Sequence, residues 1–156
     1  MRMKKKAYRI FVKPSKVKSQ ERQKGSILEG IPKDSPSLFR AYQLTRIASR
    51  AGFDWPNISE VLKKWDEEME EFREALSLQS PRKIREELGD LLFVLANIAR
   101  FLRINPEVAL RRTLGKFTRR FQYIETSLRK RGKSLRQSNL VEMDQLWEEA
   151  KKKKTK

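Results

Sequence analysis

The chain has 156 residues and a formal net charge of +17, and it contains neither cysteine nor histidine. This length allows one domain with a hydrophobic core, and the composition excludes disulfides, thiolate nucleophiles, imidazole acid–base chemistry and nearly every protein zinc site. Any chemistry must therefore use carboxylates, amines, guanidinium groups or hydroxyls.

The excess positive charge is concentrated at the two ends of the chain. Residues 1–33 carry eleven basic and two acidic side chains, residues 151–156 carry five basic ones, and the part between them holds 21 basic against 18 acidic residues. We predict a basic, flexible N-terminal arm over 1–33, one folded domain over 34–150 and a basic tail over 151–156.

The sequence predicts no membrane segment. The basic start is followed only by a short apolar run from Tyr8 to Val12, interrupted by Arg9, which is too weak for a signal peptide. No other segment is long and apolar enough to span a bilayer. We therefore expect a soluble, cytoplasmic protein that does not enter membranes.

Helix-capping residues divide the rest of the chain into five predicted helices. Ser35 before Pro36 predicts the first N-cap, and Gly52 predicts the end of that helix. Capping patterns at the later starts are formed by Asn57 with Glu60, Ser80 with Pro81, Asn105 with Pro106, and Asn139 with Glu142. The predicted helices span about 36–51, 57–78, 81–102, 106 to shortly before Gly132, and 140–152.

The pattern of apolar residues predicts an all-α fold. No segment shows a convincing two-residue alternation between turn signals. From Leu91 to Ala99 only Asn97 is polar, so this stretch must be covered on every side. Five helices can hardly provide that cover alone, and we expect a partner subunit to complete an antiparallel helical bundle.

Acidic residues lie within the apolar stripe of the second predicted helix. Glu68 falls between Trp65 and Phe72, where an unpaired carboxylate is costly to bury. Glu71 is three residues further along the same face. The alternative is an ordinary solvated face, with ion pairs such as Lys64 to Glu68.

The third predicted helix repeats this spacing with Glu87 and Asp90, and Asn97 lies two turns beyond Asp90. In an antiparallel hairpin turning near Gln79 and Ser80, the two acidic pairs would meet at one level. A hard divalent cation would relieve the repulsion between four carboxylates, and all-oxygen ligation favours magnesium, with manganese as the alternative. The predicted metal ligands are Glu68, Glu71, Glu87 and Asp90.

These residues resemble a known family. Glu67-Glu68-Met69-Glu70-Glu71 followed by Glu87-Leu88-Gly89-Asp90 resembles the EExxE and ExxD metal motifs of the MazG family of nucleoside triphosphate pyrophosphohydrolases. The similarity covers roughly residues 25–152 and continues in order through Gly30-Ile31-Pro32, Arg40-Ala41-Tyr42, Gly52 to Pro56, Gly89 to Phe93, Lys116 to Phe121, and Met143 to Trp147.

The resemblance implies an all-α homodimer that cleaves nucleoside triphosphates, with Mg²⁺, to monophosphate and pyrophosphate. It implies that Glu68, Glu71, Glu87 and Asp90 bind the metal beside Glu67, which is our candidate for the base that accepts the proton of the attacking water. It further implies that Lys64, Lys83, Lys116 and Arg120 hold phosphates and that Trp147 stacks on the base. We add Asn97 as a candidate substrate contact.

Simpler interpretations of the substrate residues stay open. Lys83 could be only a surface residue in the first turn of its helix, and Trp147 could be an apolar anchor for the last helix. Lys116 and Arg120 form a like-charge pair four residues apart, which is unfavourable on a helix unless an anion bridges it. Members of the family often carry two tandem copies of the domain, whereas this chain has one copy behind a basic arm.

Two other functions compete with the enzyme. The first is a basic helical module that binds nucleic acid without sequence preference through its terminal segments, with an inactive, relict nucleotide site. The second is a structural helical dimer with such a relict site. Metal-dependent release of pyrophosphate would identify the enzyme, whereas nucleic-acid affinity that falls steeply with salt would identify the basic module.

Overall fold

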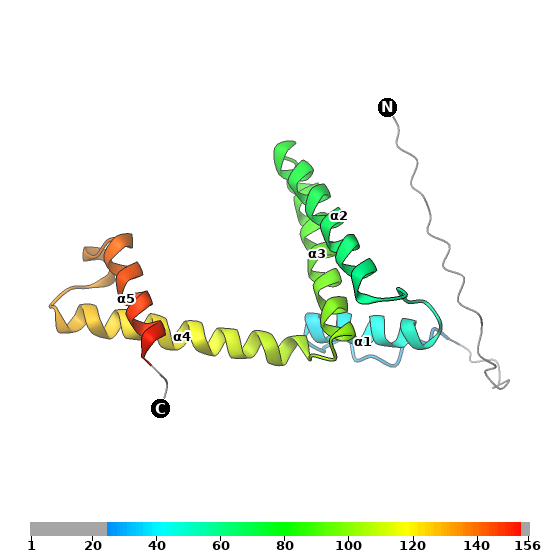
Figure 1. The fold of residues 1–156 in the computed structure, drawn as a ribbon, viewed down its shortest axis with the longest axis horizontal. Coiled ribbons are helices and arrows are strands. Elements are labelled where there is room, and N and C mark those ends of the chain that lie inside the picture. The colour runs from blue at the N-terminus through cyan, green and yellow to red at the C-terminus, as the bar shows by residue number, and fades with distance from the viewer. Residues whose placement is uncertain (1–24, 154–156) are drawn as a thin grey trace. The chain divides into compact units, whose positions relative to one another are not determined.

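A computed structural model of the chain describes residues 25–153, and these divide into two units, one ending at residue 107 and one beginning at residue 108. All regular structure in this range is helical (Figure 1). The elements are α1 (Ser37–Arg50), α2 (Ile58–Ser77), α3 (Pro81–Phe101), α4 (Pro106–Lys130), the short 3₁₀ helix η1 (Leu135–Gln137) and α5 (Leu140–Lys152). The all-α prediction is therefore confirmed for the described residues.

Most of the predicted arm lies outside the described residues. Only residues 25–33 of it are described, and they form turns. The boundaries of the arm, the domain and the tail stay predictions.

Four of the five predicted helix starts have a hydrogen bond from the backbone to the predicted side chain; before α4, Asn105 accepts one from the N–H of Glu107 at 3.0 Å. The side chains of Asn57 and Asn139 accept hydrogen bonds from the backbone N–H groups of Glu60 and Glu142, at 3.1 and 2.9 Å. Ser80 accepts a longer bond of 3.5 Å from the N–H of Lys83, and Pro81 is the first residue of α3. These caps are local, so the sequence was sufficient to place them.

The first helix starts one residue later than predicted. Pro36, not Ser35, is the N-cap of α1, and no side-chain cap bond forms there. The ψ angle of Pro36 is 134°, which is extended rather than helical, although its φ of −51° would suit a helix. The carbonyl of Pro36 accepts the first helical bond from Arg40, at 2.8 Å.

Four helices end in a residue with left-handed backbone conformation. Gly52 and Gly132 supply it after α1 and α4, as predicted, with φ of 90° and 70°. After α2 and α3 the residue is not glycine but Gln79 (φ 48°) and Arg103 (φ 56°). In each case the next residue donates back into the last turn, as Ser80 N does to Ala75 O at 3.3 Å, which is the Schellman arrangement.

The first unit is built around the antiparallel hairpin of α2 and α3, with α1 packed against α3 (Figure 1). The left-handed Gln79 lets the chain reverse within three residues, and this sets the register of the two helices. The buried apolar residues of these two helices are Val61, Ala75, Leu91, Val94 and Ala96. Two polar side chains, Glu68 and Asn97, are buried among them.

The second unit has a small core of its own. Ile124 and Leu128 of α4 are buried against Leu146 of α5, and Phe121, Met143 and Trp147 pack around them. The 3₁₀ helix η1, which the sequence did not predict, lies in the connection between α4 and α5.

Part of the apolar stretch in α3 is not covered within the chain. Leu91, Val94 and Ala96 are buried, as predicted. Leu88, Leu92 and Leu95 are nevertheless 45–47% exposed, and they follow one another at helical spacing.

No helix in the described part of the chain has the length and apolar character needed to cross a membrane.

Candidate metal centre

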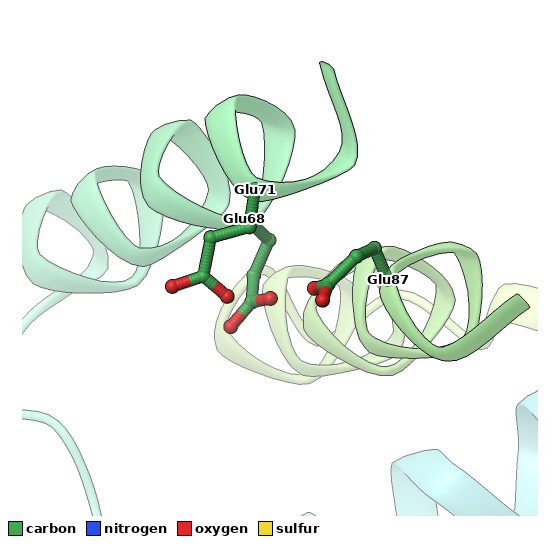
Figure 2. Close-up of side chains that lie close together, drawn as sticks. All are labelled: Glu68, Glu71 and Glu87. Carbon is green, nitrogen blue, oxygen red and sulfur yellow. The ribbon is translucent and has the colours of Figure 1, made fainter. Parts of the chain in front are cut away.

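Three carboxylates meet between α2 and α3. Oxygen atoms of Glu68, Glu71 and Glu87 all lie within 4.8 Å of one another. Figure 2 shows the two side chains of α2 pointing toward the single one of α3. The predicted hairpin therefore brings residues 16 or more positions apart in the sequence to one place.

Glu68 is the most deeply buried of the three. Only 6% of the residue is exposed. One carboxylate oxygen pairs with Lys64 Nζ at 2.6 Å, and the other, Oε2, is buried without a hydrogen-bond partner among the described residues. A buried carboxylate oxygen is costly unless a cation or a hydrogen-bond donor compensates it, so this atom is suited to bind a cation.

The other two carboxylates are more accessible. Glu71 is exposed and Glu87 is half-buried. Loss of hydration, followed by the negative charges of Glu71, Glu68, Asp90 and Glu86, raises the pKa of Glu87. The like charges are therefore close enough to influence one another.

Lys64 forms an ion pair with one member of this group, Glu68. Partial burial lowers the pKa of its ammonium, but the hydrogen bond and charge of Glu68, with a smaller effect from Glu67, raise this pKa overall. Lys64 lies one turn before Glu68 on α2, so it compensates one of the three charges. Two carboxylates, Glu71 and Glu87, are left without such compensation by Lys64.

Asp90 and Glu67 lie outside the group of three. Asp90 is exposed and follows Glu87 by three residues on α3, but it does not belong to the set of oxygens within 4.8 Å. Glu67 is exposed and lies 3.4 Å from Lys64 Nζ. Their predicted roles as fourth ligand and as proton acceptor stay predictions.

Asn97 is held by a hydrogen-bond network that the sequence did not predict. Arg100 Nε donates to Asn97 Oδ1 at 2.8 Å, and the two terminal nitrogens of Arg100 bind both carboxylate oxygens of Asp54, at 3.0 and 2.5 Å. Asn97 is 1% exposed, and its Nδ2 has no hydrogen-bond partner among the described residues. Asp54 belongs to the Gly52–Pro56 motif, but nothing in the sequence indicated its partner, which lies 46 residues away.

The remaining substrate candidate in the first unit is Lys83. It is an exposed residue in the first turn of α3, one turn before Glu87. This position agrees with either of the roles considered for it, and its binding of phosphate stays a prediction.

Lys116, Arg120 and Trp147 lie in the second unit. Lys116 and Arg120 line a cavity of about 370 Å³ together with Arg119, Tyr123, Ala150, Lys151 and Lys153. The guanidinium of Arg120 lies 5.4 Å from the centre of the Trp147 ring, and Phe117 packs against the same ring at 5.4 Å. Trp147 thus serves as an apolar anchor of α5, and base stacking stays a prediction.

The chemistry that the first unit can support follows from its donor set. The site has three carboxylates on two helices, and one oxygen of Glu68 has no hydrogen-bond partner among the described residues. Such a set of oxygen ligands is best suited to a hard divalent cation. A lysine beside them can neutralise an anion that binds the same cation.

The comparisons with known proteins all point to one family. Residues 57–124 match the family model of the MazG nucleotide pyrophosphohydrolase domain. This range includes the three clustered carboxylates, Asp90 and Arg120, and it excludes Asp54 and Trp147.

Three relatives illustrate the extent of the similarity. A Thermotoga maritima protein named nucleoside triphosphate pyrophosphohydrolase/pyrophosphatase MazG is 39% identical over 137 residues, which cover 86% of this chain and 52% of that protein. The nucleoside triphosphate pyrophosphohydrolase of Escherichia coli K12 is 35% identical over 150 residues, covering 92% and 56%. The uncharacterized protein YabN of Bacillus subtilis is 50% identical over 68 residues, covering 44% and 14%. The chain spans about half the length of the first two relatives.

Proposed function

Because the chain belongs to the MazG family through residues 57–124, we propose that it hydrolyses nucleoside triphosphates to nucleoside monophosphates and pyrophosphate. The observation that carries this proposal is the convergence of Glu68, Glu71 and Glu87 within 4.8 Å. The names of the two relatives matched over most of the chain supply the reaction, and the cluster supports the proposal that the reaction takes place between α2 and α3. Control of the nucleotide pool is the corresponding cellular role.

The cluster fits a divalent cation, and we propose magnesium, with manganese as the alternative. All the candidate ligand atoms are carboxylate oxygens, and Glu68 Oε2 is buried and unpaired. When bound there, such a cation would polarise phosphoryl oxygens and make a bound water more acidic. Asp90 stays our predicted fourth ligand.

The side chains around the cluster would bind and orient the triphosphate. Lys64 Nζ lies 2.6 Å from a carboxylate oxygen of Glu68, and its remaining N–H groups can donate to a phosphate. Lys83 is exposed one turn before Glu87. In the reaction, the oxygen of a water molecule bonds to phosphorus, the bridging bond to the leaving pyrophosphate breaks, and the proton of the water passes to a carboxylate. Our candidate for that carboxylate is the exposed Glu67.

The test is a panel of ribo- and deoxyribonucleoside triphosphates incubated with Mg²⁺, with the products separated. We expect monophosphate and pyrophosphate in equal amounts and no orthophosphate. The variant Glu71→Gln should lose at least about 100-fold in rate because it removes a ligand of the cation. The matched control is Glu70→Gln, since Glu70 is the preceding residue of α2, is exposed and pairs with Arg73 at 3.2 Å.

The outcome decides between the candidate functions. Orthophosphate as the main product, or equal rates in Glu71→Gln and Glu70→Gln, would contradict the proposed reaction. Separate Asp90→Asn and Glu67→Gln variants test the fourth ligand and the proton acceptor. A loss of metal affinity is expected for the first, and a loss of kcat with unchanged metal affinity for the second.

We also propose that the protein forms a homodimer through α3 and works in the cytoplasm. Leu88, Leu92 and Leu95 form an apolar stripe that is 45–47% exposed within one chain. An identical stripe on a second copy would cover it and complete a helical bundle. This agrees with the need for a partner that the composition of Leu91 to Ala99 predicts.

A further inference from the structure

Asp54, Arg100 and Asn97 form a chain of polar contacts that links the α1–α2 loop to α3. The guanidinium of Arg100 is fixed at one end by two hydrogen bonds to Asp54 and at the other by one to Asn97. Only 10% of the Arg100 side chain is exposed. A bidentate arginine–carboxylate pair at this depth holds its geometry well.

This pairing determines which way the Asn97 amide faces. Arg100 Nε can only donate, so the atom of Asn97 that faces it must be the carbonyl oxygen, Oδ1. The NH₂ group is therefore turned away from Arg100, and its nitrogen is buried with no acceptor among the described residues. A buried donor without an acceptor is unfavourable, and a ligand atom that accepts hydrogen bonds would satisfy it.

The position of Asn97 relates it to the candidate metal centre. It lies ten residues after Glu87 on the same helix, which corresponds to about 15 Å along the axis at 1.5 Å per residue. It also lies two turns beyond Asp90, on the same side of α3. An extended nucleotide whose phosphates are held at the carboxylates would reach this distance with its nucleoside part.

We propose that Asp54 and Arg100 are positioning residues that hold the Asn97 amide as a hydrogen-bond donor to the nucleoside part of the substrate. The inference rests on the proposed function and adds a contact beyond the phosphates. The contacted atom is an acceptor, either a carbonyl oxygen or ring nitrogen of the base or an oxygen of the sugar. Because Asn97 lies about 15 Å along the helix from Glu87, we expect this contact to bind the nucleoside rather than the phosphates held at the carboxylates.

The first experiment compares nucleoside triphosphates with inorganic tripolyphosphate, which lacks a nucleoside. In Asn97→Ala we expect KM for the best nucleotide to rise about tenfold and kcat to change less than about twofold, as for a lost neutral hydrogen bond. The inhibition constant of tripolyphosphate should stay unchanged. A KM effect that varies among the bases identifies a base atom, and one that differs between ribo- and deoxyribonucleotides identifies the sugar.

The second experiment tests positioning by Asp54 and Arg100. Asp54→Asn and Arg100→Lys should each raise KM several-fold, because neither variant can keep the bidentate pair that orients Asn97. Asp54→Asn should raise KM no further when Asn97→Ala is already present, since its effect passes through Asn97. Arg82→Lys is the matched control, because Arg82 pairs with Glu86 on the exposed side of α3 at 2.9 Å.

Equal weakening of tripolyphosphate and nucleotide in Asn97→Ala would overturn the inference, as would independent, additive effects of Asp54→Asn and Asn97→Ala on KM. Circular dichroism and thermal melting check that each variant is folded. If Asn97→Ala does not fold, Arg100→Lys takes its place in the tripolyphosphate comparison.

Calorimetric binding of nucleotide separates this inference from the proposed function. A wild-type chain that binds nucleotide through Asn97 without hydrolysing it would contradict the reaction and support the contact. Hydrolysis with the same KM in wild type and Asn97→Ala would support the reaction and overturn the contact. A wild-type chain that neither binds nor hydrolyses nucleotide would overturn both.

Discussion

Glu68 is placed where a carboxylate is unfavourable for folding. It is 6% exposed, it lies beside two further carboxylates, and one of its oxygens has no partner among the described residues. Its pairing with Lys64 at 2.6 Å compensates only part of the cost of dehydration. A residue of this kind is expected to stabilise the protein only when a cation is bound.

We therefore predict that Glu68→Gln separates stability from metal binding. Without divalent ions, the variant should melt at the same temperature as the wild type or up to about 5 °C higher, because a repulsive buried charge is removed. Magnesium should raise the melting temperature of the wild type but not of the variant. Thermal melts in chelator and in excess magnesium measure both effects.

Glu70→Gln again serves as the control and should keep the magnesium-dependent rise in melting temperature. A Glu68→Gln variant that melts well below the wild type in chelator would show that the carboxylate is structural. A variant that still responds to magnesium like the wild type would show that Glu68 is not a ligand.

At the scale of the helices, one acidic residue, Glu142, holds α5 to the segment that follows α4. Glu142, in the first turn of α5, accepts hydrogen bonds from Ser138 Oγ at 2.8 Å, from Lys133 Nζ at 3.2 Å and from Arg131 at 3.1 Å. The bonds from Ser138 and Lys133, helped by Arg131, lower the pKa of Glu142 although partial loss of hydration raises it. The ionised carboxylate thus stabilises the contact between α5 and the residues that follow α4.

We predict that this contribution disappears in acid. The pKa of Glu142 is lower in the folded than in the unfolded chain, so its stabilising effect is complete above the ordinary glutamate pKa of about 4.3 and is lost as the pH falls through the folded value. Glu142→Gln should therefore melt below the wild type at pH 7, and the difference should shrink as the pH falls from 5 to 3. A difference that stays constant over this range would contradict the role of the charge.

At the scale of the whole molecule, the uncovered stripe of α3 makes the oligomeric state testable. We predict that Leu92→Glu converts a homodimer into a monomer, because a charge at the centre of the stripe would be buried without a partner in the dimer. Light scattering coupled to size-exclusion chromatography measures the mass. Leu78→Glu is the control, since Leu78 is 56% exposed at the turn between α2 and α3.

A wild-type protein that is monomeric at micromolar concentration would contradict the proposed dimer. So would equal masses for Leu92→Glu and the wild type. A loss of catalytic activity together with dissociation would indicate that the partner subunit helps to complete the site.

The excess of positive charge is also a property of the whole chain. The largest excess lies in residues 1–33 and 151–156, and residues 1–24 and 154–156 of these segments are outside the described part. Binding of nucleic acid through the terminal segments therefore stays the alternative prediction, which a steep salt dependence of affinity would support. The described cavity beside Lys116 is basic, but a triphosphate can explain its charge equally well.

The sequence alone determined the helices and most of their ends. Asn57, Ser80 and Asn139 cap the N–H groups of residues three positions away, and Gly52 and Gly132 need no tertiary contact to adopt positive φ. These interactions act within one turn, so a local pattern predicts them. The start of α1 was displaced by one residue because the pattern does not fix the ψ angle of Pro36.

The tertiary structure decided which side chains meet. Spacing predicted four carboxylates at one level, but a contact across two helices depends on their separation and rotation, and these bring together Glu68, Glu71 and Glu87 without Asp90. The pairing of Asp54 with Arg100 crosses 46 residues and could not be read from either local motif. Short-range hydrogen bonds depend only on residues that are close together in the sequence. A contact between distant residues forms only when the helices pack against each other.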